Sequence, residues 1–167
     1  EFGIFEMGMN HLGEIDALSR IAQPHIAIIT TVSAAHIGNF KNEEEIALAK
    51  SEIFAGLVEG GLVLINADNI HFEFLKNRAI AKKIPINNII SFGSKEISNI
   101  RLLAVEKAED FNSAVTIFSS KAKQQISYLI NTINQTIIFN SLIGVACLEI
   151  AGKDSALGLE SFKNLET

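Results

Sequence analysis

The first 92 residues alternate between short apolar runs and longer segments with helical periodicity. The run His25–Val32 is rich in β-branched residues, and Leu62–Ile65 and Ile89–Phe92 are shorter runs of the same kind. Continuous apolar runs indicate strands that are covered on both faces. Strands that alternate with helices indicate βαβ units. The alternation therefore predicts an α/β fold with a mainly parallel sheet flanked by helices.

Other elements of this first part follow from local signals. Phe2–Phe5 is expected to form a short buried strand, with Glu6 at its carboxyl end. A helix is predicted over Leu12–Ala22, where apolar residues recur at helical spacing. The polar turn Asn66–Asn69 is expected to cap a further helix that reaches about Lys83.

The pattern changes in the second half of the chain, where helical periodicity gives way to short strands. Three strands are predicted there: Arg101–Val105, Ala114–Phe118 and Ile126–Ile130. Consecutive short strands joined by polar turns are typical of an antiparallel meander. We interpret it as an insertion at about residues 98–131 in a single domain over residues 1–167. An apolar helix, Gln135–Ile150, and a last helix after Gly152 complete the chain.

Composition excludes several functions. The net charge of −5 argues against a nucleic-acid partner. The sequence has no run of about 18 apolar residues, so membrane insertion is not predicted. The single cysteine, Cys147, excludes an internal disulfide and fits a reducing compartment, so a cytoplasmic protein is expected. The chain begins on an apolar run and stops just after an amphipathic helix, so we expect it to be a piece of a longer protein.

One lysine interrupts an apolar face. On a helix over Glu43–Leu57, one stripe collects four apolar residues: Ile46, Ala49, Ile53 and Leu57. Lys50 falls in the middle of this stripe. Its stem could pack while its ammonium group reaches water. Alternatively, desolvation could lower its pKa and leave a reactive neutral amine that serves as a Schiff base, a general base or a carbamate.

Several polar side chains follow predicted strands. The carboxyl ends of parallel strands meet at one edge of a sheet, which is where such folds bind ligands. Glu6, His36 and the Asn66–Asn69 turn occupy those ends, and the Lys50 helix follows the His36 loop. A lysine ammonium could not join a carboxylate and an imidazole around a divalent cation. A carbamate on Lys50 would supply an anionic oxygen, which suits a hard cation such as Mg²⁺.

Four separated motifs resemble the central domain of the Mur ligase family. They are Glu6–Ile15 (EMGMNHLGEI), Ala35–His36, Ala47–Phe54 (ALAKSEIF) and Asn66–Asn69 (NADN). Their order and spacing also match those of the family. The E-x-G-x-N-x-x-G-E-I form of the first motif is most similar to the member that adds D-alanyl-D-alanine to UDP-N-acetylmuramoyl-tripeptide.

The resemblance implies an ATP-dependent, amide-forming ligase of peptidoglycan synthesis that uses Mg²⁺. Its partners would be UDP-N-acetylmuramoyl-tripeptide and D-alanyl-D-alanine. The fold would be the P-loop-type central domain without its first β-loop-α unit. The family's phosphate loop would precede Glu6 and its C-terminal domain would follow Thr167, so both are expected in other parts of a longer chain.

The resemblance also assigns roles to individual residues. Glu6, His36 and a carbamoylated Lys50 would bind Mg²⁺, and Lys50 and His36 would be catalytic. Nucleotide contacts would come from Asn66, Asp68 and Asn140, and substrate contacts from Asn10 and His11. The chain departs from the family's Gly-x-His-Asn-x-x-Asn pattern, because Thr136 and Ile137 replace the His-Asn pair and only Asn140 matches.

Two kinds of alternative stay open. The chain could belong to a sister Mur ligase or to a folylpolyglutamate-synthase-like ligase with another amino-acid substrate. It could also be a non-catalytic nucleotide- or metal-binding module. The Asn10–Ile15 segment favours the dipeptide-adding ligase.

Overall fold

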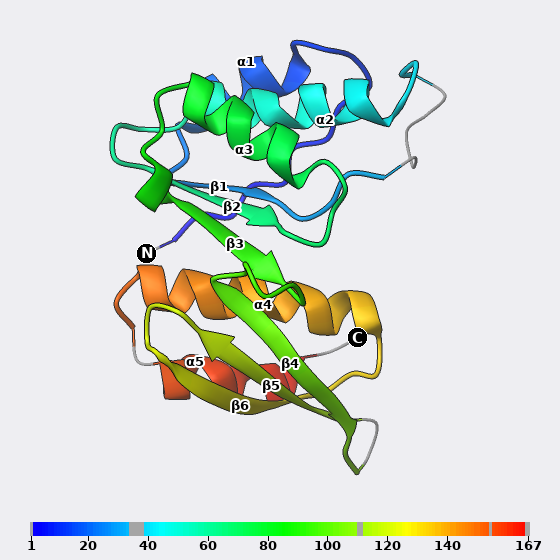
Figure 1. The fold of residues 1–167 in the computed structure, drawn as a ribbon, viewed down its shortest axis with the longest axis vertical. Helices are drawn as coiled ribbons and strands as arrows, with labels where there is room; N and C mark the ends of the chain where they lie inside the picture. The colour runs from blue at the N-terminus through cyan, green and yellow to red at the C-terminus, as the bar shows by residue number, and fades with distance from the viewer. Residues whose placement is uncertain (1, 34–38, 110–111, 154, 166–167) are drawn as a thin grey trace. The chain divides into compact units, whose positions relative to one another are not determined.

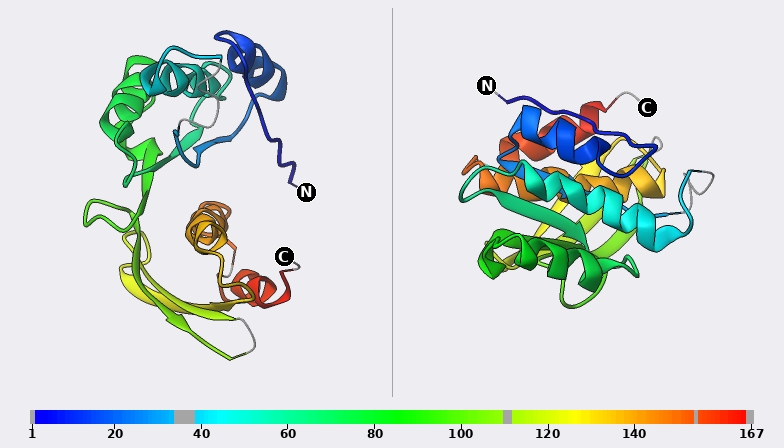
Figure 2. Two further views of the ribbon diagram at one scale, coloured as in Figure 1. Left: turned by 90° about the vertical axis from the view of Figure 1, so that its right-hand side faces the viewer. Right: turned by 90° about the horizontal axis from the view of Figure 1, so that it is seen from above.

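The computed structural model describes residues 2–33, 39–109, 112–153 and 155–165, with the side chains of residues 155–157 left out. The chain divides into two compact units, Glu1–Ile90 and Ser91–Thr167. Figures 1 and 2 show their helices and strands, and each unit is described by itself. None of the helices in the described part of the chain is long and apolar enough to cross a membrane.

The first unit is built on a pair of parallel strands. Strand β1 (Ile26–Ile29) pairs with β2 (Leu62–Asn66) in a register that sets Ile26 opposite Leu62. The helical elements of this unit are α1 (Glu14–Ala22), α2 (Glu43–Ser51), the 3₁₀ turns η2 (Glu52–Ala55) and η3 (Ile86–Asn88), and α3 (Phe72–Ala81). Helices α1, α2 and α3 lie on the same side of the strand pair (Figures 1 and 2).

The core of this unit joins the strands to α2 and α3. Its members include Ala27, Ile29, Ile46, Ala49, Val63, Ile65, Leu75 and Ala79. Ile46 and Ala49 are fully buried, and Ile53 and Leu57 pack against the core while partly exposed. The apolar stripe predicted for the Lys50 helix is therefore present.

The predicted strand over Phe2–Phe5 is wrong. The side chain of Phe2 is 76% exposed and that of Ile4 is 97% exposed, and this segment has no strand conformation. Among the described residues it pairs with no strand. An apolar run becomes a strand only where a neighbouring strand accepts and donates its backbone hydrogen bonds.

Two boundaries also differ from prediction. The helix expected over Glu43–Leu57 is α-helical only to Ser51 and continues as the tighter 3₁₀ turn η2. The turn Asn66–Asn69 does not cap α3, whose N-cap is His71. Its asparagines instead close Asx turns: the Asp68 N–H donates to Asn66 Oδ1 at 2.8 Å, and the His71 N–H donates to Asn69 Oδ1 at 2.9 Å.

The second unit is a mixed sheet covered by helix. Its strands run in the order β3 (Ile89–Gly93), β4 (Ile100–Lys107), β5 (Ser113–Ser119) and β6 (Gln124–Ile130). β3 and β4 are parallel, whereas β4, β5 and β6 pair antiparallel. The predicted antiparallel meander is therefore confirmed, and so is the α/β class with parallel pairing in both units.

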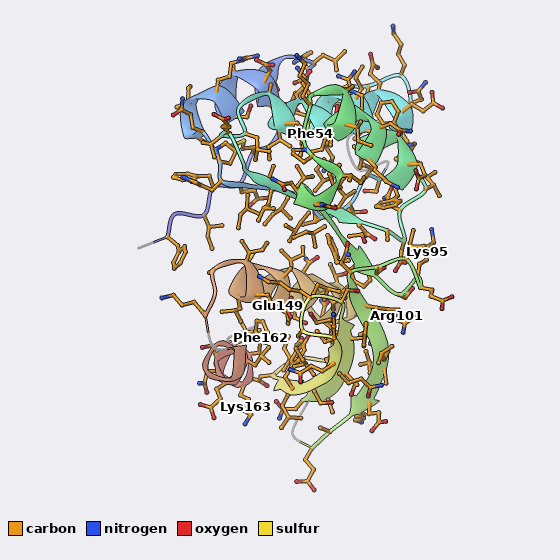
Figure 3. All side chains as sticks on the ribbon, turned by 60° about the vertical axis from the view of Figure 1, so that its left-hand side comes forward. Phe54, Lys95, Arg101, Glu149, Phe162 and Lys163 are labelled. Carbon is orange, nitrogen blue, oxygen red and sulfur yellow. The ribbon has the colours of Figure 1, made fainter. Side chains whose placement is uncertain are left out.

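Helix α4 (Gln135–Ile150) supplies the core of the second unit together with the meander. Its buried side carries Ile138, Ser141, Leu142, Val145 and Ala146. The chain ends in α5 (Ser155–Glu160) and η4 (Ser161–Asn164). Phe162 of η4, labelled in Figure 3, has its ring centroid 5.3 Å from that of Tyr128 on β6. The last turn of the chain therefore closes one side of this core.

Candidate functional site

Lys50 lies near the end of α2, with its side chain half-buried. Burial lowers the pKa of its amine below the usual range, and no charged neighbour contributes to that shift. Within the described chain, its Nζ is in none of the ion pairs and makes no hydrogen bond. Partial desolvation without a carboxylate partner makes the neutral form more accessible than in an exposed lysine, and the neutral amine is the form that could become a carbamate.

The described residues do not assemble a metal site around Glu6. Glu6 is exposed and follows no strand, and His36 lies outside the described residues. Among the residues described, no group of three or more His, Cys, Asp or Glu side chains could hold a metal ion. The carbamate on Lys50 therefore stays a prediction.

The segment with the predicted substrate residues is held by Glu14. The backbone N–H groups of Asn10 and His11 donate to Glu14 Oε2 at 2.6 and 3.2 Å. His11 Nδ1 lies 3.3 Å from Glu14 Oε1. These contacts, the Asn10 N–H foremost, lower the pKa of the Glu14 carboxyl. In addition, Asn39 Nδ2 donates to Asn10 Oδ1 at 3.1 Å, which ties this segment to the chain that leads into α2.

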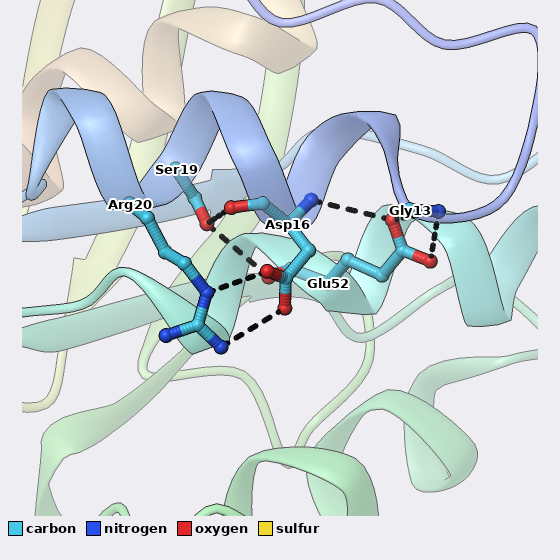
Figure 4. A network of polar contacts seen from close by, with 5 residues as sticks. All are labelled: Gly13, Asp16, Ser19, Arg20 and Glu52. Carbon is cyan, nitrogen blue, oxygen red and sulfur yellow. Dashed lines mark hydrogen bonds and ion pairs between the residues drawn. The ribbon is translucent and has the colours of Figure 1, made fainter.

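A second carboxylate, that of Glu52, reaches the start of α1 from η2 (Figure 4). The Gly13 N–H donates to Glu52 Oε1 and Oε2 at 2.8 and 2.9 Å, and the Asp16 N–H donates to Oε2 at 3.3 Å. The first N–H groups of a helix lack partners within it and attract negative charge. Glu52 therefore caps α1 from a different element, because Gly13 has no side chain with which to do so.

Further contacts hold α1 against η2. Ser19 Oγ donates to the Asp16 carbonyl at 2.9 Å and approaches the Glu52 carbonyl at 3.4 Å. On the outer side, Arg20 Nε lies 2.5 Å from Asp16 Oδ1, and this contact lowers the pKa of the Asp16 carboxyl. Figure 4 shows these side chains together.

Sequence reasoning gave Glu14 and Glu52 no role of their own. Glu14 carried a signal, because a glutamate three or four residues after polar residues at a helix start is a capping pattern. Glu52 carried none, because its partner Gly13 is 39 residues away in the sequence. In the structure, the carboxylates of Glu14 and Glu52 both accept hydrogen bonds from backbone N–H groups.

Of the predicted nucleotide residues, Asn66 is the last residue of β2 and Asp68 lies in the turn that follows it. Asn66 Nδ2 donates to the Thr30 carbonyl at 3.1 Å, and Asn69 Nδ2 donates to the Val32 carbonyl at 2.8 Å. These bonds bring the turn to the chain that follows β1. The carboxyl ends of β1 and β2 therefore lie side by side, as predicted.

Asn140 lies in the second unit, exposed on α4. The segment that departs from the family pattern forms the start of this helix. Asn134 Oδ1 accepts the N–H groups of Thr136 and Ile137 at 2.9 and 3.3 Å. Here Thr136 and Ile137 act through their backbone, which explains how the helix begins without the His-Asn pair.

Comparisons with known proteins agree with this arrangement. The family model described as the Mur ligase middle domain matches residues 1–148. The chain is 43% identical over 103 residues to UDP-N-acetylmuramoyl-tripeptide–D-alanyl-D-alanine ligase of Rickettsia prowazekii, covering 62% of the chain and 22% of the relative. To the ligase of the same name from Bacillus subtilis it is 30% identical over 166 residues, covering 98% of the chain and 33% of the relative.

Solved structures show the same fold. The crystal structure of MurF from Acinetobacter baumannii superposes with a TM-score of 0.82 at 22% identity, covering 96% of this chain and 33% of that one. A pseudomurein peptide ligase from Methanothermus fervidus superposes with a TM-score of 0.70 at 15% identity. The chain thus spans a third or less of the relatives and structures it matches first. The match over residues 1–148 shows that this chain belongs to the Mur ligase middle-domain family.

Proposed function

We propose that this chain is the central domain of an ATP-dependent ligase that joins D-alanyl-D-alanine to UDP-N-acetylmuramoyl-tripeptide in the cytoplasm. The domain would span residues 1–167, with the antiparallel insertion at about residues 98–131. The observation that carries the proposal is the 43% identity over 103 residues to the Rickettsia prowazekii relative of that name. The match to the Bacillus subtilis relative extends the similarity over 98% of the chain.

Mg²⁺ would be held by Glu6, His36 and a carbamate on Lys50. When bound, the cation would offset the negative charge that develops as a phosphoryl group is transferred. Burial of Lys50 disfavours its ammonium form and lowers the pKa of the amine, which supports a reaction of the neutral amine with carbon dioxide. Because α2 is packed on the core through Ile46 and Ala49, the resulting anionic oxygens would be fixed in place.

In such a ligase the terminal phosphoryl group of ATP passes to the carboxylate of the tripeptide. The amine of D-alanyl-D-alanine then displaces phosphate and forms the amide bond. Asn140, Asn66 and Asp68 are the proposed nucleotide contacts. Asn10 and His11 are the proposed substrate contacts, held in position by Glu14.

The full-length protein that contains this chain provides the test. In separate reactions, purified protein is given ATP and Mg²⁺ with either UDP-N-acetylmuramoyl-tripeptide and D-alanyl-D-alanine, or UDP-N-acetylmuramoyl-L-alanyl-D-glutamate and 2,6-diaminopimelate, the pair that a sister ligase joins. We expect phosphate release and a product of the correct mass with D-alanyl-D-alanine alone. Product with another amine would identify a sister ligase, and nucleotide binding without phosphate release would identify a non-catalytic module. Either result would refute the proposal.

A further inference from the structure

Strand β6 has one open backbone edge in the second unit. It pairs with β5 on one side, and no strand in the described part of the chain pairs with its other side. This edge borders a groove of about 430 Å³, which is lined by Gln124–Leu129 of β6 and by Leu159, Glu160 and Lys163. Figure 1 shows α5 beside β6. The backbone groups of β6 that do not pair with β5 are therefore available to another strand.

β6 lacks the features that usually keep an edge strand from pairing. Natural sheets protect their edges with charged side chains, prolines or bulges. The sequence of β6, QQISYLI, contains no charge and no proline. Its register with β5 is also continuous from Gln124 to Ile130, whereas the β4–β5 pair shifts at Leu102. The strand can therefore accept a partner along its length.

The charged side chains beside the groove are complementary to those of a second copy. Glu160 ends α5 and Lys163 lies in η4, and both side chains are exposed. Neither is in an ion pair within the described part of the chain. A two-fold axis places the same surface on both copies, so an acid and a base on that surface can pair twice across the axis.

We propose that β6 and the adjoining groove form the interface of a symmetric dimer, in which the β6 strands of two copies pair antiparallel. The two-fold axis of such a pair stands perpendicular to the sheet, so the α5 helices of both copies lie on the same face. Glu160 of each copy then faces Lys163 of the other. This proposal does not rest on the proposed ligase function, because none of these residues belongs to the proposed ligase site.

Charge reversal in the full-length protein tests the proposal. Sedimentation equilibrium should show monomers and dimers of the wild type. Glu160→Lys and Lys163→Glu should each weaken self-association about tenfold, because two attractive contacts become repulsive. The double variant Glu160→Lys/Lys163→Glu should dimerise like the wild type, because both pairs form again with their signs exchanged. An equimolar mixture of the two single variants should form a mixed dimer.

Glu106→Lys is the matched control. It makes the same charge change at an exposed position on β4, and β5 separates β4 from β6. Self-association of this variant should equal that of the wild type.

Amide hydrogen exchange tests whether the β6 backbones pair. It is measured on the wild-type protein below and above the concentration at which it dimerises. Amides of Gln124–Ile130 should exchange more slowly in the dimer, whereas amides of α4 should exchange equally in both samples. Glu160→Lys should lose this protection at the concentration where the wild type has it.

Three outcomes would overturn the inference. The first is a full-length protein that stays monomeric at every concentration; if its β6 amides are protected throughout, another segment of the longer chain covers the edge instead. The second is a dimer that the single reversals weaken no more than Glu106→Lys does, or that the double variant does not restore. The third is a dimer in which exchange of the β6 amides is the same as in the monomer.

Discussion

Lys50 is a cation on a face that otherwise packs into the core. Its neighbours on that face, Ile46 and Ala49, are fully buried, and its own pKa is lowered by desolvation alone. An amine held in this way is costly as a charge, because no carboxylate in the described chain compensates for its burial. The cost is avoided if the amine is neutral, or if it is carbamoylated and shares a cation with Glu6 and His36.

The carbamate hypothesis predicts the behaviour of two variants in the full-length enzyme. Lys50→Arg should abolish ligase activity, because arginine stays cationic and does not form the carbamate. Lys50→Ala should also be inactive but should recover in part with added acetate, which can supply the missing anionic oxygen. Stability of Lys50→Ala should be unchanged or higher, because alanine has the higher helix propensity. Rates of amide formation with and without acetate are the measurement, and a nearly normal arginine variant would support a simple snorkelling lysine.

Tyr128 is a second buried titratable residue, in the core of the second unit. Its hydroxyl lies 2.6 Å from Ser141 Oγ, and Ser141 Oγ in turn donates to the Ile138 carbonyl at 2.6 Å. Burial raises the pKa of Tyr128 to about 12, and the Ser141 hydrogen bond offsets part of this shift. The neutral phenol is therefore the form that the folded chain requires.

The raised pKa predicts a loss of stability in alkali. An unfolded tyrosine releases its proton near pH 10, whereas the folded one holds it to about 12. The folded state thus binds more protons in this window, so its stability is complete below pH 10 and falls as the pH rises toward 12. The loss should reach roughly 2–3 kcal/mol above pH 12, and about half of this should appear between pH 9 and pH 11. The test is urea unfolding of the wild type and of Tyr128→Phe at pH 9 and 11. Only the wild type should lose the part of its unfolding free energy that comes from Tyr128.

At the scale of elements, the contact between α1 and η2 joins residues that are far apart in the sequence. The two elements are joined by the Glu52 cap and by a close backbone approach at Gly56. A Cβ built on Gly56 would lie 2.0 Å from the Ser19 carbonyl oxygen and 2.6 Å from the Arg20 nitrogen. Gly56 has φ of −95°, which any residue can adopt, so the requirement for glycine comes from space alone.

Gly56→Ala should therefore separate α1 from η2. Because the clash is with backbone and not with a flexible side chain, we expect a loss of at least about 1–3 kcal/mol in unfolding free energy. Gly8→Ala is the control, since a Cβ there meets nothing within 4 Å. Denaturant unfolding of both variants is the measurement. Equal stability of the two would contradict the close approach.

At the scale of the whole molecule, the chain consists of two compact units and spans a third or less of its first-matched relatives. Each unit has its own buried core, one around Ile46 and Val63 and the other around Ile117 and Leu142. We therefore expect the chain to fold without the remaining length of those relatives, and we expect catalysis, as proposed, to need groups beyond this chain.

The 167-residue chain is accordingly expected to fold but to be inactive. Circular dichroism should show cooperative unfolding, while assays of ATP hydrolysis and of amide formation should stay at background. The full-length protein, measured in parallel, should be active under the same conditions. Turnover by the 167-residue chain would show that it contains every group the reaction needs.

The sequence by itself determined the order and type of most elements. Strand runs such as Leu62–Ile65 and helical stripes such as that of Ile46 and Ala49 are local patterns, and the parallel pair, the meander and α4 formed where those patterns predicted. The motifs around Glu6, Lys50 and Asn66 also identified the family, because their order along the chain needs no coordinates. The roles proposed for individual site residues stay predictions.

Only the tertiary structure decided which groups meet. Phe2–Phe5 is exposed, because a strand requires a partner that no local pattern contains. Asn66 and Asn69 bind the chain after β1 instead of capping α3, because folding brings those carbonyls to them. The cap that Glu52 provides for α1 spans 39 residues, and the space that Gly56 requires is set by another helix. Such contacts depend on distances between segments, which hydrophobic periodicity along the chain does not encode.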